Sequence, residues 1–192
     1  MIAPMRAARA AGLALLLTVA ASLGTVAHAA DPAVAFMNKV ARELLTASRS
    51  RSPDAVATVI RRYADVNYIG IYSLGTHRRK LTSDVRSTYY AGMVRFIGRY
   101  AAKEAPKYPV ARYQILSSVQ GGSGLMVDSR IFMRDGSTYD VRWLLAKHGS
   151  TYRVRDAMVY GFWMTPFLRK LFEGYVDENG GSVKALVTAL NR

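Results

Sequence analysis

Cysteine is missing from this sequence of 192 residues, and histidine occurs only three times. Without cysteine the chain cannot form a disulfide, a thiolate nucleophile or a cysteine metal cluster. Acidic residues are also scarce, with 13 Asp and Glu against 27 Lys and Arg, which gives a formal net charge of +14. Such a balance attracts anions, so the candidate partners are nucleic acid, anionic lipid headgroups or an acidic protein.

Long apolar runs are missing everywhere except near the N-terminus. Two arginines precede the apolar run 12–21, and Ala27 and Ala29 supply the small residues of a signal-peptidase site. The alternative is a membrane anchor, but this run is shorter than the roughly 20 residues that span a bilayer. We therefore expect residues 1–29 to be a cleaved export signal. Export makes nucleic acid the least favoured of the three partners.

The first half of the remaining chain, residues 30–192, repeats apolar residues at helical spacing, and the whole segment is long enough for one domain. Pro32 and Pro53 stand where the first helical turn tolerates proline, and Ser52 is a candidate N-cap. We expect helices over residues 32–47, from 53 onward, over 66–74, and from 82 or 83 to 102.

After Pro109 the period of the apolar pattern changes from 3.6 to 2. Short glycine-containing turns separate the candidate strands, so they predict an antiparallel meander. The strands are expected over residues 110–119, 124–134, 137–147 and 151–160, followed by a helix over 164–175 and a last helix capped by Ser182. Helices before and after one sheet indicate an α+β fold, with helices packed on one face of a curved antiparallel sheet of about four strands.

One face of the expected sheet is strongly apolar and aromatic. By alternation it carries Leu125, Val127, Ile131 and Met133, then Tyr139, Val141, Trp143 and Leu145, then Tyr152, Val154 and Met158. Asp156 falls on this same face, where a carboxylate is costly unless it is paired or hydrogen-bonded. We expect it to anchor a neighbouring backbone group or an arginine. The apolar residues either fill a closed core, which the residues alone favour, or line an open pocket.

Catalytic patterns are not evident in the sequence. There is no G-x-S-x-G elbow, and neither His77 nor His148 lies in a segment that suggests a catalytic triad. The glycine-rich run 121–124 leads from one strand to the next, which is typical of a hairpin loop and not of a phosphate-binding turn. We therefore expect no enzyme activity, no cofactor and no metal.

A series of short motifs runs in order along nearly the whole mature chain. It comprises Leu74-Gly75, Leu81-Thr82, Arg86, Tyr89-Tyr90, Phe96, Tyr100, Tyr113 to Leu116, Tyr152 to Asp156 with Gly161, Arg169, Phe172, Gly180-Gly181, Leu186 and Leu190. The combination of Y-R-V-x-D, a glycine five residues later, an R-x-x-F helix and the G-G-x-x-x-A-L end is moderately specific. Together the series resembles the MlaC-like family of periplasmic lipid-binding proteins, also called the toluene-tolerance auxiliary family.

This resemblance implies an NTF2-like sheet whose helices enclose a deep apolar cavity for lipid acyl chains. It implies a soluble periplasmic carrier that moves phospholipid between an outer-membrane complex and an inner-membrane ABC transporter. A subgroup associated with hopanoid biosynthesis suggests a hopanoid as an alternative ligand, and an exported structural or interaction protein without a ligand is a further alternative. The sequence departs from the family pattern at Arg78, Val85 and Phe162, and the rings of Phe162 and Trp163 could narrow the cavity.

With the resemblance, an open pocket is favoured over a closed core. The expected lipid-binding wall consists of Tyr72, Tyr89, Phe96, Val127, Ile131, Val141, Trp143, Met158 and Phe162. The basic run His77, Arg78, Arg79 and Lys80 is expected to contact anionic headgroups or partner proteins, or else to be a solvated loop. The tails would be held passively, without covalent chemistry.

Overall fold

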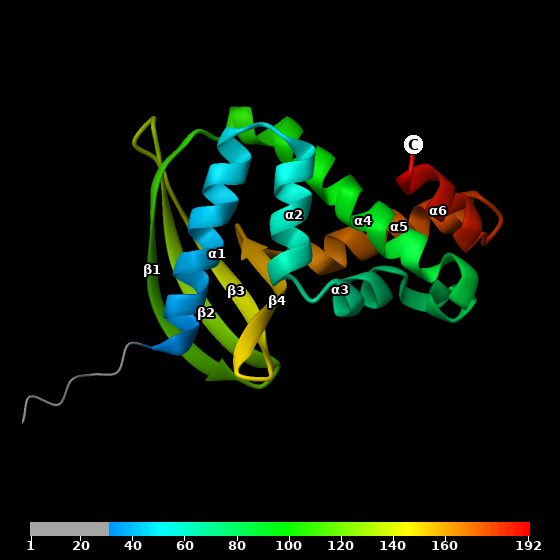
Figure 1. Cartoon of the computed structure of the whole chain (residues 1–192), viewed down its shortest axis with the longest axis horizontal. Coiled ribbons are helices and arrows are strands. Elements are labelled where there is room, and N and C mark those ends of the chain that lie inside the picture. Colours follow the sequence, from blue (N-terminus) through cyan, green and yellow to red (C-terminus); the bar gives the residue numbers. More distant parts are fainter. Residues whose placement is uncertain (1–30) are drawn as a thin grey trace, which may run out of the picture.

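A computed structural model of the chain describes residues 31–192 (Figure 1), so the expected export signal lies outside the described residues. The helices are α1 (Pro32–Arg49), α2 (Pro53–Tyr63), α3 (Val66–Ser73), α4 (Ser83–Glu104), α5 (Met164–Glu178) and α6 (Val183–Leu190), with 3₁₀ segments η1 (Gly75–Lys80) and η2 (Ala105–Lys107). The strands are β1 (Val110–Gly121), β2 (Gly124–Met133), β3 (Thr138–His148), β4 (Thr151–Val159) and β5 (Phe162–Trp163). Among these helices, none has both the length and the apolar character needed to span a membrane.

The order of the elements confirms the predicted α+β fold, with a short fifth strand in addition to the four expected. All five strands pair antiparallel in the order β1-β2-β3-β4-β5. Helices α1 and α2 lie over one face of this sheet, and α3 to α6 extend away from it to one side (Figure 1). The predicted caps are also confirmed, since the Ser52 and Ser182 hydroxyls each accept the backbone N–H of the residue three positions later.

The strand register confirms the apolar face predicted on β2 and β3. Val127 lies opposite Trp143, and Ile131 lies opposite Tyr139. Directly opposed residues of antiparallel strands point to the same side of the sheet. The other side carries ion pairs, with Arg142 Nε 2.7 Å from the Asp128 carboxylate.

A β-bulge in β4 overturns part of the prediction. Leu144 pairs with Asp156 while Leu145 pairs with Val154, so Arg155 is an extra residue in β4. A bulge moves every later side chain of the strand to the other face. Met158 consequently pairs with Arg142, away from Trp143. The prediction that Met158 and Asp156 share a face with Tyr152 and Val154 is therefore wrong.

The bulge attaches two helices to the sheet. Asp156 accepts hydrogen bonds from the backbone N–H of Ala157 (2.8 Å) and of Thr165 (2.9 Å), in the first turn of α5. This confirms the expected role of Asp156 as a backbone anchor, and burial raises the pKa of its carboxyl. Arg155 Nε lies 3.0 Å from the carboxylate of Asp65, the N-cap residue of α3. Strand β4 thus positions the start of both α3 and α5.

Buried apolar side chains form two separate clusters. The sheet core lies between the sheet and helices α1 and α2, and the helix core lies among α4, α5 and α6. The sheet core contains Ala33, Met37, Val40, Ala47, Val56, Val59, Tyr63, Val127 and Leu145. The helix core contains Ala57, Leu74, Leu81, Tyr89, Met93, Val94, Leu168, Phe172, Val176, Val183, Leu186, Val187 and Leu190.

Helix α2 joins the two cores, since Val56 belongs to the sheet core and Ala57 to the helix core. It packs closely on α4 at Gly98, where an added Cβ would lie 2.6 Å from the Pro53 carbonyl oxygen. Only glycine fits at such a contact with backbone. The two layers therefore meet along a narrow helix-helix seam.

Glu173 on α5 holds the 3₁₀ segment η1 in place. Its carboxylate accepts the Thr76 backbone N–H at 2.7 Å and pairs with Arg169 Nε at 2.8 Å. The Arg169 hydrogen bond and the Thr76 N–H lower the pKa of Glu173 to about 2. The approach is so close that a Cβ at Gly75, where φ is +50°, would lie 1.8 Å from Glu173 Oε1.

Replacing Asp156 tests the helix anchor. Asp156→Ala removes the acceptor of the Thr165 N–H, and we expect it to lower the free energy of unfolding by about 1–2 kcal/mol. Asp156→Asn keeps an oxygen acceptor without the charge, so its stability at pH 7 should equal or exceed that of the wild type. The raised pKa contributes stability below the ordinary value of 3.8, which is lost as pH rises through the folded-state pKa. Urea unfolding of the wild type and both variants, at pH 7 and below pH 4, measures these differences in stability. Equal losses of stability in Asp156→Asn and Asp156→Ala would contradict the role of the oxygen acceptor.

Glu173→Gln tests the attachment of η1. We expect a loss of about 1–2 kcal/mol at pH 7, the usual value for charged hydrogen bonds discounted for partial exposure. A lowered pKa stabilises the fold above the ordinary value of 4.5, and this contribution is lost as pH falls toward about 2. The difference in free energy of unfolding between Glu173→Gln and the wild type should therefore vanish as the pH is lowered from 4.5 to about 2, as measured by denaturation curves. Glu178→Gln, exposed at the end of the same helix, is the control and should change little.

Candidate functional site

Four of the nine expected wall residues share one face of β2 and β3: Val127, Ile131, Val141 and Trp143. The Trp143 indole N–H donates to the Ser129 hydroxyl at 2.9 Å, and that hydroxyl donates to the Val141 carbonyl at 3.1 Å. This chain of hydrogen bonds satisfies the polar atoms of an otherwise apolar surface and fixes the indole ring. The four residues therefore form a rigid, mainly apolar wall.

Tyr89 and Phe96 lie on α4 and pack into the helix core, apart from this wall. Tyr89 is fully buried, its hydroxyl donates to the Gly70 carbonyl at 2.8 Å, and burial raises its pKa. The Phe96 ring meets the Phe172 ring edge to face at 5.8 Å. Tyr89 and Phe96 therefore belong to the helix core, whereas Val127 and Trp143 belong to or pack against the sheet core.

The three other expected wall residues lie in three different places. Tyr72 is on α3, partly exposed and stacked on Tyr68. Met158 is on the opposite face of the sheet from Trp143, and Phe162 on β5 is 73% exposed. The nine residues therefore do not line one enclosed cavity in this structure.

Helix α5 presents an exposed apolar stripe. Helical periodicity predicts the helix, but it does not tell this stripe from the buried side. Met164, Phe167 and Leu171 are spaced to share one side of the helix, and all three are exposed, Phe167 by 60%. The buried side of the helix is formed by Leu168, Phe172 and Val176. The apolar arc of α5 is therefore wider than the helix core needs, and this width was the available sequence signal.

The exposed side chains Phe162, Met164, Phe167 and Leu171 are here called the α5 stripe. Its first residue, Phe162, adjoins the sheet wall. Phe162 pairs with Val159, and Val159 pairs with Val141. All three side chains consequently point to the face that also carries Trp143. The α5 stripe therefore begins at Phe162, next to Val159 at the edge of the sheet wall.

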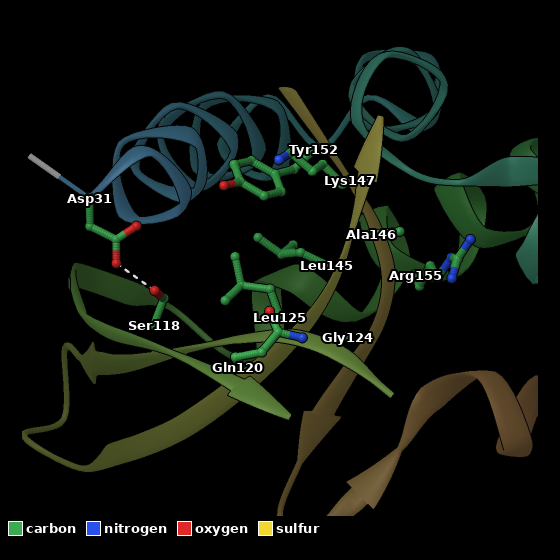
Figure 2. A pocket seen from close by; sticks show the side chains of 10 residues that line it. All are labelled: Asp31, Ser118, Gln120, Gly124, Leu125, Leu145, Ala146, Lys147, Tyr152 and Arg155. Atoms are coloured by element: carbon green, nitrogen blue, oxygen red, sulfur yellow. Dashed lines mark hydrogen bonds between the residues drawn. The ribbon is translucent and has the colours of Figure 1, made fainter. Parts of the chain in front are cut away.

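An open hollow of about 630 Å³ lies between the start of α1 and the sheet. Figure 2 shows Leu125, Leu145 and Tyr152 between α1 and the strands, with the Ser118 hydroxyl bonded to the Asp31 carboxylate at one side. That bond, together with the α1 backbone N–H groups, lowers the pKa of Asp31. The volume lies within the range of about 300–1,000 Å³ typical of ligand clefts. The lining residues include none of the nine expected wall residues, but Leu125, Leu145 and Tyr152 belong to the apolar sheet face predicted from the sequence. The full lining is Asp31, Ser118, Gln120, Gly124, Leu125, Leu145, Ala146, Lys147, Tyr152 and Arg155.

A second hollow, of about 370 Å³, adjoins the first through Tyr152. Aromatic rings and basic side chains line it together: Phe36, Tyr63 and Tyr152 with Lys39, Arg62 and Arg153, beside Pro32, Ala35 and Thr151. Glu43 offsets part of this charge, since its carboxylate lies 2.8 Å from Arg62. The hollow combines apolar contact with positive charge.

The expected basic run lies in η1, where its members have different surroundings. His77 Nε2 lies 2.8 Å from the Asp177 carboxylate, and Lys80 donates to the Gly181 carbonyl at 3.0 Å. Arg78 and Arg79 are exposed. The run is therefore fastened at two residues and presents two arginines to solvent.

Within residues 31–192 no three His, Asp or Glu side chains gather in a way that could hold a metal ion. The most buried carboxyl with a raised pKa, Asp156, is engaged with backbone N–H groups. The arrangement offers apolar surface, aromatic rings and cations. These are features of binding, since they hold amphipathic anions without breaking bonds.

Comparison with known proteins agrees with this architecture. The chain is similar in structure to the phospholipid-binding protein from Ralstonia solanacearum, solved in complex with a phospholipid, with a TM-score of 0.68 and 17% sequence identity over 84% of this chain and 96% of that chain. No curated protein matches the sequence significantly. The family model described as MlaC protein matches residues 33–192, almost the whole of the described chain. The chain therefore belongs to the MlaC family.

Proposed function

We propose that this protein is a soluble periplasmic carrier that sequesters a phospholipid and shuttles it between the outer and inner membranes, in a pathway linked to an ABC transporter. Residues 1–29 would be its cleaved export signal and residues 30–192 its single lipid-binding domain. Membership of the MlaC family supports this proposal. The structural relative in complex with a phospholipid supports the choice of ligand.

The observation that carries the proposal is the α5 stripe. Large apolar side chains on one continuous surface are normally covered in a soluble protein, at a gain of about 25 cal/mol per Å² of apolar area. Here Phe162 and Phe167 are 73% and 60% exposed, and Phe162 lies beside the apolar wall of the sheet. Acyl chains laid along this surface would cover both.

Apolar contact alone provides enough affinity for such a ligand. Each methylene removed from water contributes about 0.8 kcal/mol, so two acyl chains provide well over ten kcal/mol before the costs of binding are subtracted. No covalent step is needed. The proposal is therefore of a binding protein and not of an enzyme.

The separation of the two cores suggests how the tails are admitted. The sheet core and the helix core meet along the seam of α2 and α4 at Gly98. Tails can lie over Phe162 and along the α5 stripe, whose side chains are exposed and belong to neither core. The headgroup then stays near water, with Arg78 and Arg79 available to an anionic headgroup or a partner protein.

Native mass spectrometry of the mature protein, purified from its own periplasm, tests the proposal, with organic extraction to identify any bound molecule. One bound phospholipid per chain is the expected result. A hopanoid would keep the carrier role and change the ligand. A protein that stays free of lipid, even after incubation with phosphatidylethanolamine and phosphatidylglycerol vesicles, would contradict the proposal.

Phe167→Asp tests the site itself. Because Phe167 is 60% exposed, the charge should leave the fold intact while lowering the affinity for lipid about 10- to 100-fold, equivalent to burying one large side chain. Val119→Asp is a matched control, since Val119 is 61% exposed and pairs with Met126, on the other face of the sheet from Val127. Extraction and quantification of bound phospholipid compares the two variants. Equal occupancy in both would place the site elsewhere.

A further inference from the structure

The turn between β4 and β5 has an unusual residue at its tip. Val159 and Phe162 pair with each other, so Tyr160 and Gly161 are the two residues of a tight hairpin loop. Their φ angles are +52° and +81°. Two positive φ angles are those of a type I′ turn, in which Asn-Gly is strongly preferred.

A tyrosine at the first position of this turn is strained. In the left-handed region the Cβ of an L-residue lies too close to the following carbonyl oxygen, and aromatic residues rarely adopt it. Among residues 31–192 the only other non-glycine residue with positive φ is Arg51, at φ +55°. Arg51 lies just after α1, where left-handed residues commonly end a helix. Tyr160 does not follow a helix, so its positive φ is not explained in this way.

Burial does not explain the tyrosine, because the residue is 63% exposed. Its defined contact is with the Tyr139 ring, edge to face at 4.9 Å. The interaction of the two hydroxyls, and then desolvation, raise the pKa of Tyr160 to about 12. Tyr139 therefore holds the Tyr160 ring in one orientation, while most of the ring stays open to solvent.

The strained turn lies beside the proposed site. Phe162, the first residue of the α5 stripe, follows the turn directly. Residues held in sparsely populated backbone conformations cluster at functional sites, where the strain serves binding. A tyrosine ring also has an apolar body and a polar tip, which suits the boundary between acyl chain and headgroup.

We propose that Tyr160 is a ligand-binding residue that determines lipid retention: its ring, oriented by Tyr139, covers the acyl chains where they leave the α5 stripe at Phe162. This inference rests on the proposed function, and it names the mouth of that site. The backbone strain at Tyr160 is retained because asparagine or glycine, which would relieve it, would not cover the lipid.

The experiment combines stability and lipid occupancy. Tyr160→Asn relieves the strain, so we expect its Tm to rise by about 2–4 °C. It also removes an aromatic anchor, so we expect its lipid occupancy to fall on the order of tenfold. Tyr160→Phe keeps the ring but loses the hydroxyl, so it should retain more lipid than Tyr160→Asn. The matched control is Arg51→Asn, which relieves strain at the other position and should raise the Tm without changing occupancy. Occupancy is measured on purified protein and after delipidation and incubation with phosphatidylethanolamine and phosphatidylglycerol vesicles.

The outcomes separate this inference from the proposed function. A wild type that carries lipid, with Tyr160→Asn retaining it equally, would overturn the role of Tyr160 and leave the carrier function standing. A Tm that falls in Tyr160→Asn would show that tyrosine is there for stability, which also overturns the inference. A wild type that binds no lipid would overturn both.

Discussion

The β-bulge at Arg155 is the constraint on which the arrangement of the two layers depends. One extra residue in β4 turns Arg155 toward Asp65 at the start of α3 and turns Asp156 toward the backbone of Thr165 at the start of α5. Without it, the strand would direct both side chains differently, and the contacts of Arg155 with Asp65 and of Asp156 with Thr165 would be lost. Bulges commonly redirect side chains in this way next to functional sites. The helices that bear the exposed apolar surface are thus held by an irregularity of one strand.

The same strand ends in the second irregularity, the strained turn at Tyr160. Between the bulge and the turn, β4 contributes Val159 to the apolar wall and Met158 to the opposite face. Beyond the turn the chain continues through β5 into α5. A regular strand joined by an Asn-Gly turn would be more stable. This strand instead positions the helix layer and places the exposed Tyr160 at the proposed mouth of the lipid site. If Tyr160 binds lipid as proposed, stability and binding compete at this turn.

Two small cores in place of one large core also follow from this geometry. A single core would bury Phe167 and Leu171, but the helix core closes with Leu168, Phe172 and Val176 and leaves the adjoining stripe uncovered. Apolar surface of this kind is unfavourable in water until a ligand covers it. The exposed stripe therefore supplies a driving force for the lipid binding proposed above. The excess of positive charge adds attraction for anionic headgroups or acidic partners.

The sequence by itself determined the helices, four of the strands, their order and the N-caps Ser52 and Ser182, because these depend on local periodicity, proline positions and short polar side chains. It also determined that Val127 and Trp143 share a face, since alternation is exact along an unbroken strand. Only the tertiary structure decided that Met158 turns away, that Tyr89 and Phe96 belong to a second core, and that Phe167 stays exposed. A bulge is specified by pairing with another strand, and burial by which helix arrives to cover a side chain, so both depend on contacts between residues far apart in the chain.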